Sequence, residues 1–310
     1  MTHVAGAPLL LVHGGAGVIR RDMDAATEKA VREALSEALQ RGLQQLAGGR
    51  SAVDAMAAAV TTLEDAPYFN AGRGAVFTHT GVNELDAAIM DGADLRAGAV
   101  AGLRHVRNPV LLARAVMEHS PHVMLAGEGA ESFAREQGLA LVEPGYFRTD
   151  RRWRELQDAQ RQATAGDRVD HFGTVGAVAL DGQGRLAAAT STGGMTDKRW
   201  GRIGDAPVIG AGTYANAACA MSGTGWGEFY LRTAAAHAVC MRVALLHESV
   251  AAASDAVINH EIPGLGGSGG AIVLAADGSF ALPFNTDGMY RGWMAGGDAP
   301  HVAIWPDERI

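Results

Sequence analysis

The sequence predicts an α+β fold in which helices cover two packed antiparallel β-sheets. Short β-compatible segments joined by glycine turns occur at residues 75–103, 174–190 and 271–283, and helical patterns separate them. The chain has 310 residues, of which 48% are hydrophobic, so it can bury a substantial core. Since no Pro- or Ser-rich linker or charge run divides the chain, we expect one domain spanning residues 1–310.

The first elements are a strand and two helices. Residues 8–12 (PLLLV) form an apolar run typical of a buried strand. Residues 22–46 place apolar side chains on one helical face. Ser51 and Asp54 have the spacing of a capping box, which predicts a second helix through residue 63. These two helices are expected to form one layer.

The middle of the chain alternates between strands and helices. The β-compatible pieces at 75–78, 84–90 and 97–103 predict an antiparallel meander. Asn108 and Pro109 have the pattern of an N-cap followed by proline, which opens a helix through Met117. The most polar stretch, residues 150–170, predicts an exposed helix or loop.

The second half begins with a hairpin whose first strand starts at Thr174 and whose turn lies at 181–184. The remaining expected elements are a strand at 207–212, helices at 228–246 and 249–258, and a final hairpin of strands 271–274 and 279–283.

Composition excludes several classes of function. The net charge is −8, and no Lys/Arg cluster with interleaved aromatic residues indicates a nucleic-acid partner. Cys219 and Cys240 lack metal-ligand spacing and are interpreted as buried free thiols, which suits a reducing compartment. The apolar run at 8–12 is too short for a signal peptide or a membrane span, so no membrane partner and a cytoplasmic location are expected.

Three short motifs do not support a cofactor site. HGGAG at 13–17 lacks the third glycine of a dinucleotide fingerprint and the Lys-Ser/Thr of a phosphate loop. GGSGG at 266–270 lies between Pro263 and a strand, so Ser268 is interpreted as a turn residue and not as a serine nucleophile. His260 and Glu261 lack the second histidine of a zinc helix. We therefore predict that no cofactor is required.

The Gly173-Thr174 bond joins the polar tract to a buried strand. By itself, this pair is an ordinary loop-to-strand junction. Hydroxyl residues gather again at 190–196, Arg202 and Asp205 place opposite charges three residues apart, and a glycine-rich segment at 222–228 precedes a helix. Each of these segments, taken alone, is compatible with a simple turn.

Together, in order and spacing, these segments resemble the plant-type asparaginase and isoaspartyl aminopeptidase family of N-terminal-nucleophile hydrolases. The resemblance covers nearly the whole chain and rests on these motifs: HGGAG at 13–17, NAG at 70–72, GTVG at 173–176, GGSGG at 266–270 and PFNT at 283–286. It implies a four-layer αββα sandwich that cuts itself between Gly173 and Thr174 into an α subunit, 1–173, and a β subunit, 174–310. It also implies that two such heterodimers pair as (αβ)2.

An N-terminal nucleophile needs a hydroxyl residue whose own α-amino group becomes free, because that amine has an unperturbed pKa near 8 and can act as a base. Thr174 must therefore become a chain terminus, and Gly173 permits the strained backbone that self-attack demands. The resemblance implies that Thr192 hydrogen-bonds near the nucleophile and that Thr224 and Gly225 donate to the oxyanion.

Asn70 matches the family's active-site asparagine and is expected to orient the surroundings of the nucleophile. A turn-forming asparagine is the alternative interpretation of this residue.

The resemblance assigns substrate recognition to opposite charges. Arg202 would hold an α-carboxylate, Asp205 an α-ammonium, and Gly225 and Gly227 would line the site, with Gly227 accepting from the ammonium. A surface ion pair between Arg202 and Asp205 is the alternative.

The implied reaction is hydrolysis of β-aspartyl dipeptides and of L-asparagine to L-aspartate. A glycosylasparaginase is disfavoured because the nucleophile of that class lies in an Asp-Thr-Ile-Gly context. A non-catalytic aspartate-binding protein of the same fold is the rival from another class.

Relatives also bind a structural sodium ion through backbone carbonyls of a loop that matches residues 63–73. The carbonyls implied here belong to Leu63, Glu64, Ala66, Phe69, Ala71 and Arg73. Two departures from the family pattern are the large Trp226 beside the expected oxyanion site and a short linker before Gly173, in which His171 lies.

Overall fold

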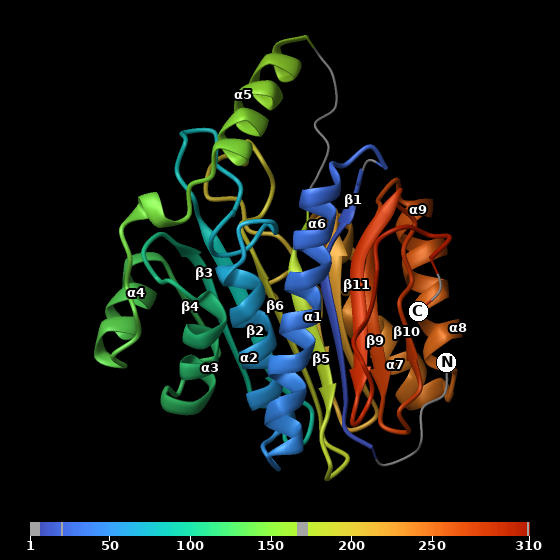
Figure 1. Ribbon diagram of the computed structural model, residues 1–310. Helices are drawn as coiled ribbons and strands as arrows, with labels where there is room; N and C mark the ends of the chain where they lie inside the picture. The colour runs from blue at the N-terminus through green and yellow to red at the C-terminus, as the bar shows by residue number, and fades with distance from the viewer. Residues whose placement is uncertain (1–6, 20, 166–172, 309) are drawn as a thin grey trace.

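Two β-sheets lie face to face, with helices on both outer faces (Figure 1), in a computed structural model that describes residues 7–19, 21–165, 173–308 and 310. The predicted four-layer αββα sandwich is therefore confirmed. The large sheet has eight strands and the small sheet has four.

The large sheet has the order β12-β11-β1-β5-β6-β2-β3-β4. Its strands are β1 (Leu9–Gly17), β2 (Leu85–Asp91), β3 (Ala97–Leu103), β4 (Met124–Ala126), β5 (Val175–Leu180), β6 (Leu186–Thr192), β11 (Gly288–Ala295) and β12 (His301–Ala303). Every neighbouring pair is antiparallel as predicted except β3 and β4, which are parallel. The sheet is therefore mixed at this one edge.

The small sheet is antiparallel throughout and has the order β10-β9-β8-β7. Its strands are β7 (Thr213–Ala215), β8 (Cys219–Gly225), β9 (Gly269–Ala275) and β10 (Phe280–Ala281). The large sheet mixes strands from before and after Gly173, because β1 lies between β11 and β5. Cleavage at Gly173 would leave the two pieces sharing one sheet.

The helices form the two outer layers and one projection. Their bounds are α1 (Ala25–Ala47), α2 (Ala52–Asp65), α3 (Pro109–His119), α4 (Gly127–Glu136), α5 (Asp150–Ala165), α6 (Gly227–Thr233), α7 (Ala235–Leu246), α8 (Val250–Ser254) and α9 (Ile262–Gly264), with a 3-10 turn at Pro144–Tyr146 and a π-helical segment at Asp255–Glu261. Helices α1 to α3 pack on the large sheet, and α7 and α8 pack on the small sheet. Helix α5 extends beyond the end of the large sheet at which β5 begins (Figure 1).

The core lies at the three interfaces between the four layers, and strand β1 illustrates its origin. Successive side chains of a strand point to opposite faces. Leu10 and Val12 accordingly join the core under α1 and α2, whereas Leu9 and Leu11 join the core between the sheets. A third core, which includes Val239 and Val273, lies between the small sheet and its helices. The unbroken apolar run of β1 reflects burial on both faces.

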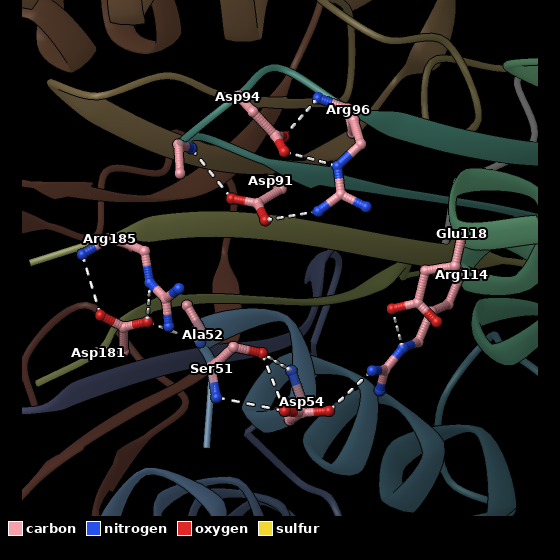
Figure 2. A network of polar contacts seen from close by, with 11 residues as sticks. Ser51, Ala52, Asp54, Asp91, Asp94, Arg96, Arg114, Glu118, Asp181 and Arg185 are labelled. Carbon is pink, nitrogen blue, oxygen red and sulfur yellow. Dashed lines mark hydrogen bonds and ion pairs between the residues drawn. The ribbon is translucent and has the colours of Figure 1, made fainter. Parts of the chain in front are cut away.

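The predicted capping box at Ser51 and Asp54 is confirmed, and it belongs to a larger polar network (Figure 2). Asp54 also pairs with Arg114 of α3 at 2.8 Å. Asp181, in the turn between β5 and β6, accepts from the Ala52 amide at 3.3 Å and from Arg185 Nε at 2.8 Å. These contacts fix helix α2 to the far end of the hairpin that begins at Thr174.

Several local predictions were wrong. Within residues 75–78 only Phe77 and Thr78 make isolated bridges, and residues 207–212 form turns and a bend with one isolated bridge at Ile209. The expected helix over 228–246 breaks at Ala234, whose φ of 47° is left-handed. Strand β8 was not predicted, because its glycine-rich residues from Ser222 onward are compatible with a turn. Small residues are needed where β8 packs against Tyr230, since a Cβ on Gly223 would lie 3.0 Å from that ring.

Of the described helices, none taken alone has the length and apolar character needed to cross a membrane. Helices α6 and α7, bent by 42°, meet that test only as a pair, by length and composition.

Candidate active site

Strand register brings Thr174 and Thr192 together. Val175 pairs with Ser191 across β5 and β6, so Thr174, just before β5, lies beside Thr192, the last residue of β6. The Thr174 Oγ1 hydroxyl donates to Thr192 Oγ1 at 3.0 Å. The Gly194 amide donates to the same Thr192 oxygen at 3.0 Å, which fixes that side chain. The predicted nucleophile therefore has a positioned hydroxyl partner.

Thr224 reaches Thr174 from the small sheet. The Thr174 amide nitrogen donates to Thr224 Oγ1 at 3.3 Å, and the Ala16 amide donates to the same oxygen at 3.3 Å. Thr224 is fully buried and Thr174 is 9% exposed. The nitrogen that cleavage would release as an amine thus lies next to the Thr224 hydroxyl, in a site that largely excludes water.

Gly225 ends β8 and has no room for a side chain. Its φ is 149°, and a Cβ there would lie 2.4 Å from the Ser268 carbonyl oxygen. Tyr230 secures this corner, because its buried hydroxyl lies 3.1 Å from the Thr224 carbonyl oxygen and 3.0 Å from that of Gly270. Burial raises the pKa of Tyr230 well above its usual value, so it keeps its proton. Ser268 lies directly before β9, two residues after the turn at Leu265 and Gly266.

The peptide that joins Gly173 to Thr174 lies against the β1 backbone. Gly173 has a left-handed φ of 53°, and Gly15, next to a bulge in β1, has a φ of 112°. A Cβ on Gly15 would lie 2.2 Å from Gly173 Cα and 3.1 Å from the Thr174 nitrogen. Only glycine at position 15 permits this approach.

His13 contacts the backbone of the predicted nucleophile, and it was not predicted as a site residue. Its Nδ1 lies 2.9 Å from the Thr174 carbonyl oxygen and its Nε2 lies 2.8 Å from Ser222 Oγ. Burial lowers the pKa of His13 to about 3, so the ring is neutral at neutral pH. Because a carbonyl only accepts, Nδ1 carries the proton and Nε2 accepts from Ser222. The available sequence signal was a histidine at the head of the HGGAG motif.

Asn70 organises the loop next to Thr192. Its Nδ2 donates to the Gly194 carbonyl at 2.7 Å, and its Oδ1 accepts from the Val76 amide at 2.9 Å. The Asn70 carbonyl accepts from the Gly193 amide at 3.1 Å. Since Gly194 in turn donates to Thr192, Asn70 helps to orient the partner of the nucleophile.

Arg202 and Asp205 both lie against Gly227, on the side where a Cβ would be. A Cβ on Gly227 would lie 2.7 Å from Arg202 Nη2 and 2.7 Å from Asp205 Oδ1. Asp205 is 5% exposed, and its Oδ2 is buried without a hydrogen-bond partner among the described residues. Burial raises the pKa of Asp205 to about 6, and Arg202 opposes that rise. A buried carboxylate oxygen without a partner is costly, and an ammonium group is the kind of ligand that would satisfy it.

Glu228 is a further charged residue here that sequence analysis did not assign. Arg202 Nε and Nη2 each donate to one Glu228 carboxylate oxygen at 2.9 Å. The arginine is 18% exposed and the glutamate 43%. Arg202 is therefore paired with Glu228. The surface ion-pair alternative required Arg202 to pair with Asp205, and the described contacts include no such pair. The only sequence signal was an acidic residue in the first turn of a helix after a glycine-rich segment.

The loop expected to bind sodium contains converging carbonyls. The Pro67 and Phe69 oxygens lie 2.6 and 2.8 Å from where a Cβ on Gly74 would be. The Glu64 carbonyl accepts from the Arg73 amide at 2.7 Å, and the Leu63 carbonyl accepts from Ala66. Within the described parts of the chain, no three His, Cys, Asp or Glu side chains form a metal-binding group.

Trp226 and His171 were noted as features of the sequence. Trp226 packs edge-on against Phe229, with ring centroids 5.1 Å apart, and its amide donates to the Ser268 carbonyl at 2.9 Å. It lies at the predicted oxyanion corner, directly after Gly225. His171 falls outside the described residues.

Comparison with known proteins supplies the family. The asparaginase family model matches residues 6–304. The chain belongs to this family. It is 48% identical to the "Isoaspartyl peptidase" of Escherichia coli K12 over 98% of each chain. It is 40% identical to the human "Isoaspartyl peptidase/L-asparaginase" over 97% of each chain. Family membership and the sandwich architecture together confirm the N-terminal-nucleophile hydrolase fold.

Proposed function

We propose that this member of the asparaginase family hydrolyses β-aspartyl dipeptides and L-asparagine to L-aspartate. The observation that carries the proposal is the threonine cluster at the start of β5, where the Thr174 hydroxyl meets Thr192 at 3.0 Å and its nitrogen meets Thr224 at 3.3 Å. The family match and the relatives' names support the substrate class.

The first step in this proposal is self-cleavage. The Thr174 Oγ1 attacks the carbonyl carbon of Gly173, the C–N bond breaks, the acyl group moves to Oγ1 as an ester, and the hydroxyl proton passes to the Thr174 nitrogen. Water then hydrolyses this ester, which leaves a carboxylate on Gly173 and a free amine on Thr174. The left-handed Gly173 and its close contact with Gly15 support the step, because they hold the bond in a conformation that few residues adopt.

Hydrolysis of substrate uses the same hydroxyl. The free Thr174 amine accepts the Oγ1 proton as Oγ1 attacks the β-carbonyl carbon of the substrate. Thr224 and Gly225 stabilise the negative oxygen of the tetrahedral intermediate, and a donor of this kind is worth roughly 3 kcal/mol of barrier. The proton then passes to the leaving nitrogen, ammonia or an amino acid departs, and water cleaves the aspartyl ester.

Recognition of the aspartyl half rests on Arg202 and Asp205. Asp205 would accept from the substrate ammonium, and the Gly225–Gly227 segment would line the same space, because a Cβ on Gly227 would lie 2.7 Å from Asp205 Oδ1. Arg202 would hold the α-carboxylate while Glu228 keeps its Nε and Nη2 edge in place. Glu228 is therefore proposed as a positioning residue for Arg202.

Three further features belong to the same proposal. Pairing of two heterodimers as (αβ)2 would cover exposed apolar side chains, of which Trp200 is 96% exposed. The two buried free thiols, Cys219 and Cys240, suit the reducing cytoplasm. A sodium ion would bind the carbonyls of the 63–73 loop and would support the backbone around Asn70 without taking part in the reaction.

The test compares wild-type protein with Thr174→Ala on three substrates: L-asparagine, β-aspartyl-leucine and a glycosylated asparagine. We expect release of L-aspartate from the first two by wild type only. Cleavage of the glycosylated substrate without turnover of β-aspartyl-leucine would support the glycosylasparaginase alternative. Binding of aspartate without any turnover would support the binding-protein alternative.

A further inference from the structure

A cavity opens on the Gly173 side of the nucleophile. Its volume is about 170 Å³, and its wall includes Gly173, Asn70 and the glycine-rich end of β1. Arg202, Asp205 and Gly227 do not line it. The cavity is therefore distinct from the space assigned to the aspartyl half of the substrate.

One part of the cavity wall is apolar. Ile19, Met23, Phe69 and Tyr290 line it, and Phe69 meets Tyr290 edge-on with centroids 5.9 Å apart. An apolar cavity of about 150 Å³ can hold a benzene-sized ligand. The space is thus suited to one apolar amino-acid side chain.

The other part of the wall is basic and comes from the base of α5. Arg151, Arg152 and Glu155 line it, so two cations meet one anion. Arg152 is 4% exposed and is held by the Gly74 carbonyl at 2.7 Å and by Glu155 at 2.8 Å. Arg151 Nη2 donates to the Tyr68 carbonyl at 2.7 Å, and Arg151 Nε lies 3.7 Å from Glu155. Glu155 is therefore shared between two arginines.

Arg151 is the cation that is short of negative charge. Glu155 lies 2.8 Å from Arg152 Nη1 but 3.7 Å from Arg151 Nε, so Arg151 is the less closely paired of the two guanidinium groups. The Arg151 side chain is 43% exposed, so a ligand can reach it. A carboxylate placed beside Arg151 would offset the repulsion between the two guanidinium groups.

We propose that this cavity is the subsite for the leaving group of β-aspartyl dipeptides, with Arg151 binding the α-carboxylate of the departing amino acid. The inference rests on the proposed function. When the aspartyl half occupies Arg202 and Asp205, the other half of the substrate must extend elsewhere from the carbonyl that Thr174 attacks. In the intact chain Gly173 lines the cavity and is bonded to Thr174, so the cavity begins next to the nitrogen that cleavage frees.

The subsite predicts how substrates differ. L-Asparagine releases ammonia, which carries no carboxylate and no side chain, so it gains nothing from Arg151. β-Aspartyl-leucine fills both the basic and the apolar part. β-Aspartyl-leucine amide keeps the side chain and loses the charge, which isolates the contribution of Arg151.

The experiment measures kcat/KM for these three substrates in wild type, Arg151→Met and Arg154→Met. Arg154 is the matched control, because it is an exposed arginine of the same helix that contacts only the Asp150 carbonyl, at 3.2 Å, among the contacts described. In Arg151→Met we expect the ratio of kcat/KM for β-aspartyl-leucine to that for L-asparagine to fall about tenfold. The wild-type preference for the free dipeptide over its amide should disappear in the same variant, and Arg154→Met should retain both ratios.

Two results separate the inference from the function beneath it. If wild type hydrolyses L-asparagine and Arg151→Met leaves both ratios unchanged, the subsite is wrong and the proposed function stands. An equal loss on all three substrates would also overturn the subsite, because it would indicate a structural role for Arg151. If wild type hydrolyses none of them, the proposed function is wrong, and the subsite, which rests on that function, is wrong as well.

Discussion

Substitution of Gly15 by alanine should slow self-cleavage strongly, because position 15 holds the Gly173-Thr174 bond in place. An alanine Cβ would lie 2.2 Å from Gly173 Cα, whereas ordinary contact begins at 3.4 Å. The two backbone segments would have to separate by about 1.2 Å. No side-chain rotation relieves the clash, since the opposing atom belongs to the backbone.

The expected magnitude has two parts. Displacing reacting groups by about 1 Å can slow a reaction on the order of 100-fold. Placing a residue other than glycine at a φ of 112° costs about 1–3 kcal/mol of folding stability. Gly15→Ala should therefore fold less stably and cleave about 100 times more slowly than wild type.

The assay follows the intact chain over time by denaturing electrophoresis, beside Gly297→Ala as a control. Gly297 has a similar φ of 91°, but a Cβ there would meet no atom within 4 Å. The control should lose a comparable amount of folding stability, because it too places alanine at a positive φ, and it should cleave at the wild-type rate. Normal cleavage by a folded Gly15→Ala chain would refute the idea that close contact with β1 positions the bond.

Three further predictions concern the nucleophile and two buried carboxyls. Thr192→Val keeps the shape of the side chain and removes the oxygen that Thr174 contacts, so kcat for L-asparagine should fall about 10- to 100-fold with the fold retained; an unchanged kcat would contradict this role. Burial raises the pKa of Asp205 to about 6, so protonation below that pH removes the charge that an ammonium needs. Inhibition by L-aspartate should weaken about tenfold per pH unit below 6, and Asp205→Asn should abolish that dependence; an equally steep dependence in the variant would count against Asp205. Burial raises the pKa of Glu64 from 4.5 to about 8. Between these two pH values the folded chain keeps a proton on Glu64 that the unfolded chain releases. The stability that this group contributes is therefore lost as pH rises. In an uncleaved Thr174→Ala background, the free energy of unfolding should fall by about 2 kcal/mol between pH 6.5 and 8. Glu64→Gln in the same background should remove that loss. An equal loss in both proteins would show that a group other than Glu64 causes it.

Much of the fold followed from local patterns. The hairpin that starts at Thr174 could be predicted because its turn residues and alternation lie within 20 positions of one another. Its register then placed Thr192 beside Thr174. The β1 strand and the Ser51 capping box were equally local. Strand β8 was missed because its small and hydroxyl residues, chosen for close packing between layers, have the composition of a turn.

The remaining parts of the site depend on contacts between distant segments. The His13 ring meets Thr174 and Ser222 across separations of 161 and 209 residues, and no local pattern reports such a contact. The capture of Arg202 by Glu228 spans 26 residues and joins a loop to a helix. The predicted partner for Arg202 was a substrate, so its occupation by a protein carboxylate was not foreseen.

The central claim is that Thr174 becomes an N-terminal nucleophile. The most direct measurement is the mass of purified protein under denaturing conditions, with N-terminal sequencing of the smaller piece. Residues 1–173 and 174–310 of the 32.2 kDa chain should appear as fragments of about 18 and 14 kDa, the smaller beginning at Thr174. A chain that stays intact after prolonged incubation at neutral pH, yet still hydrolyses L-asparagine, would contradict the account.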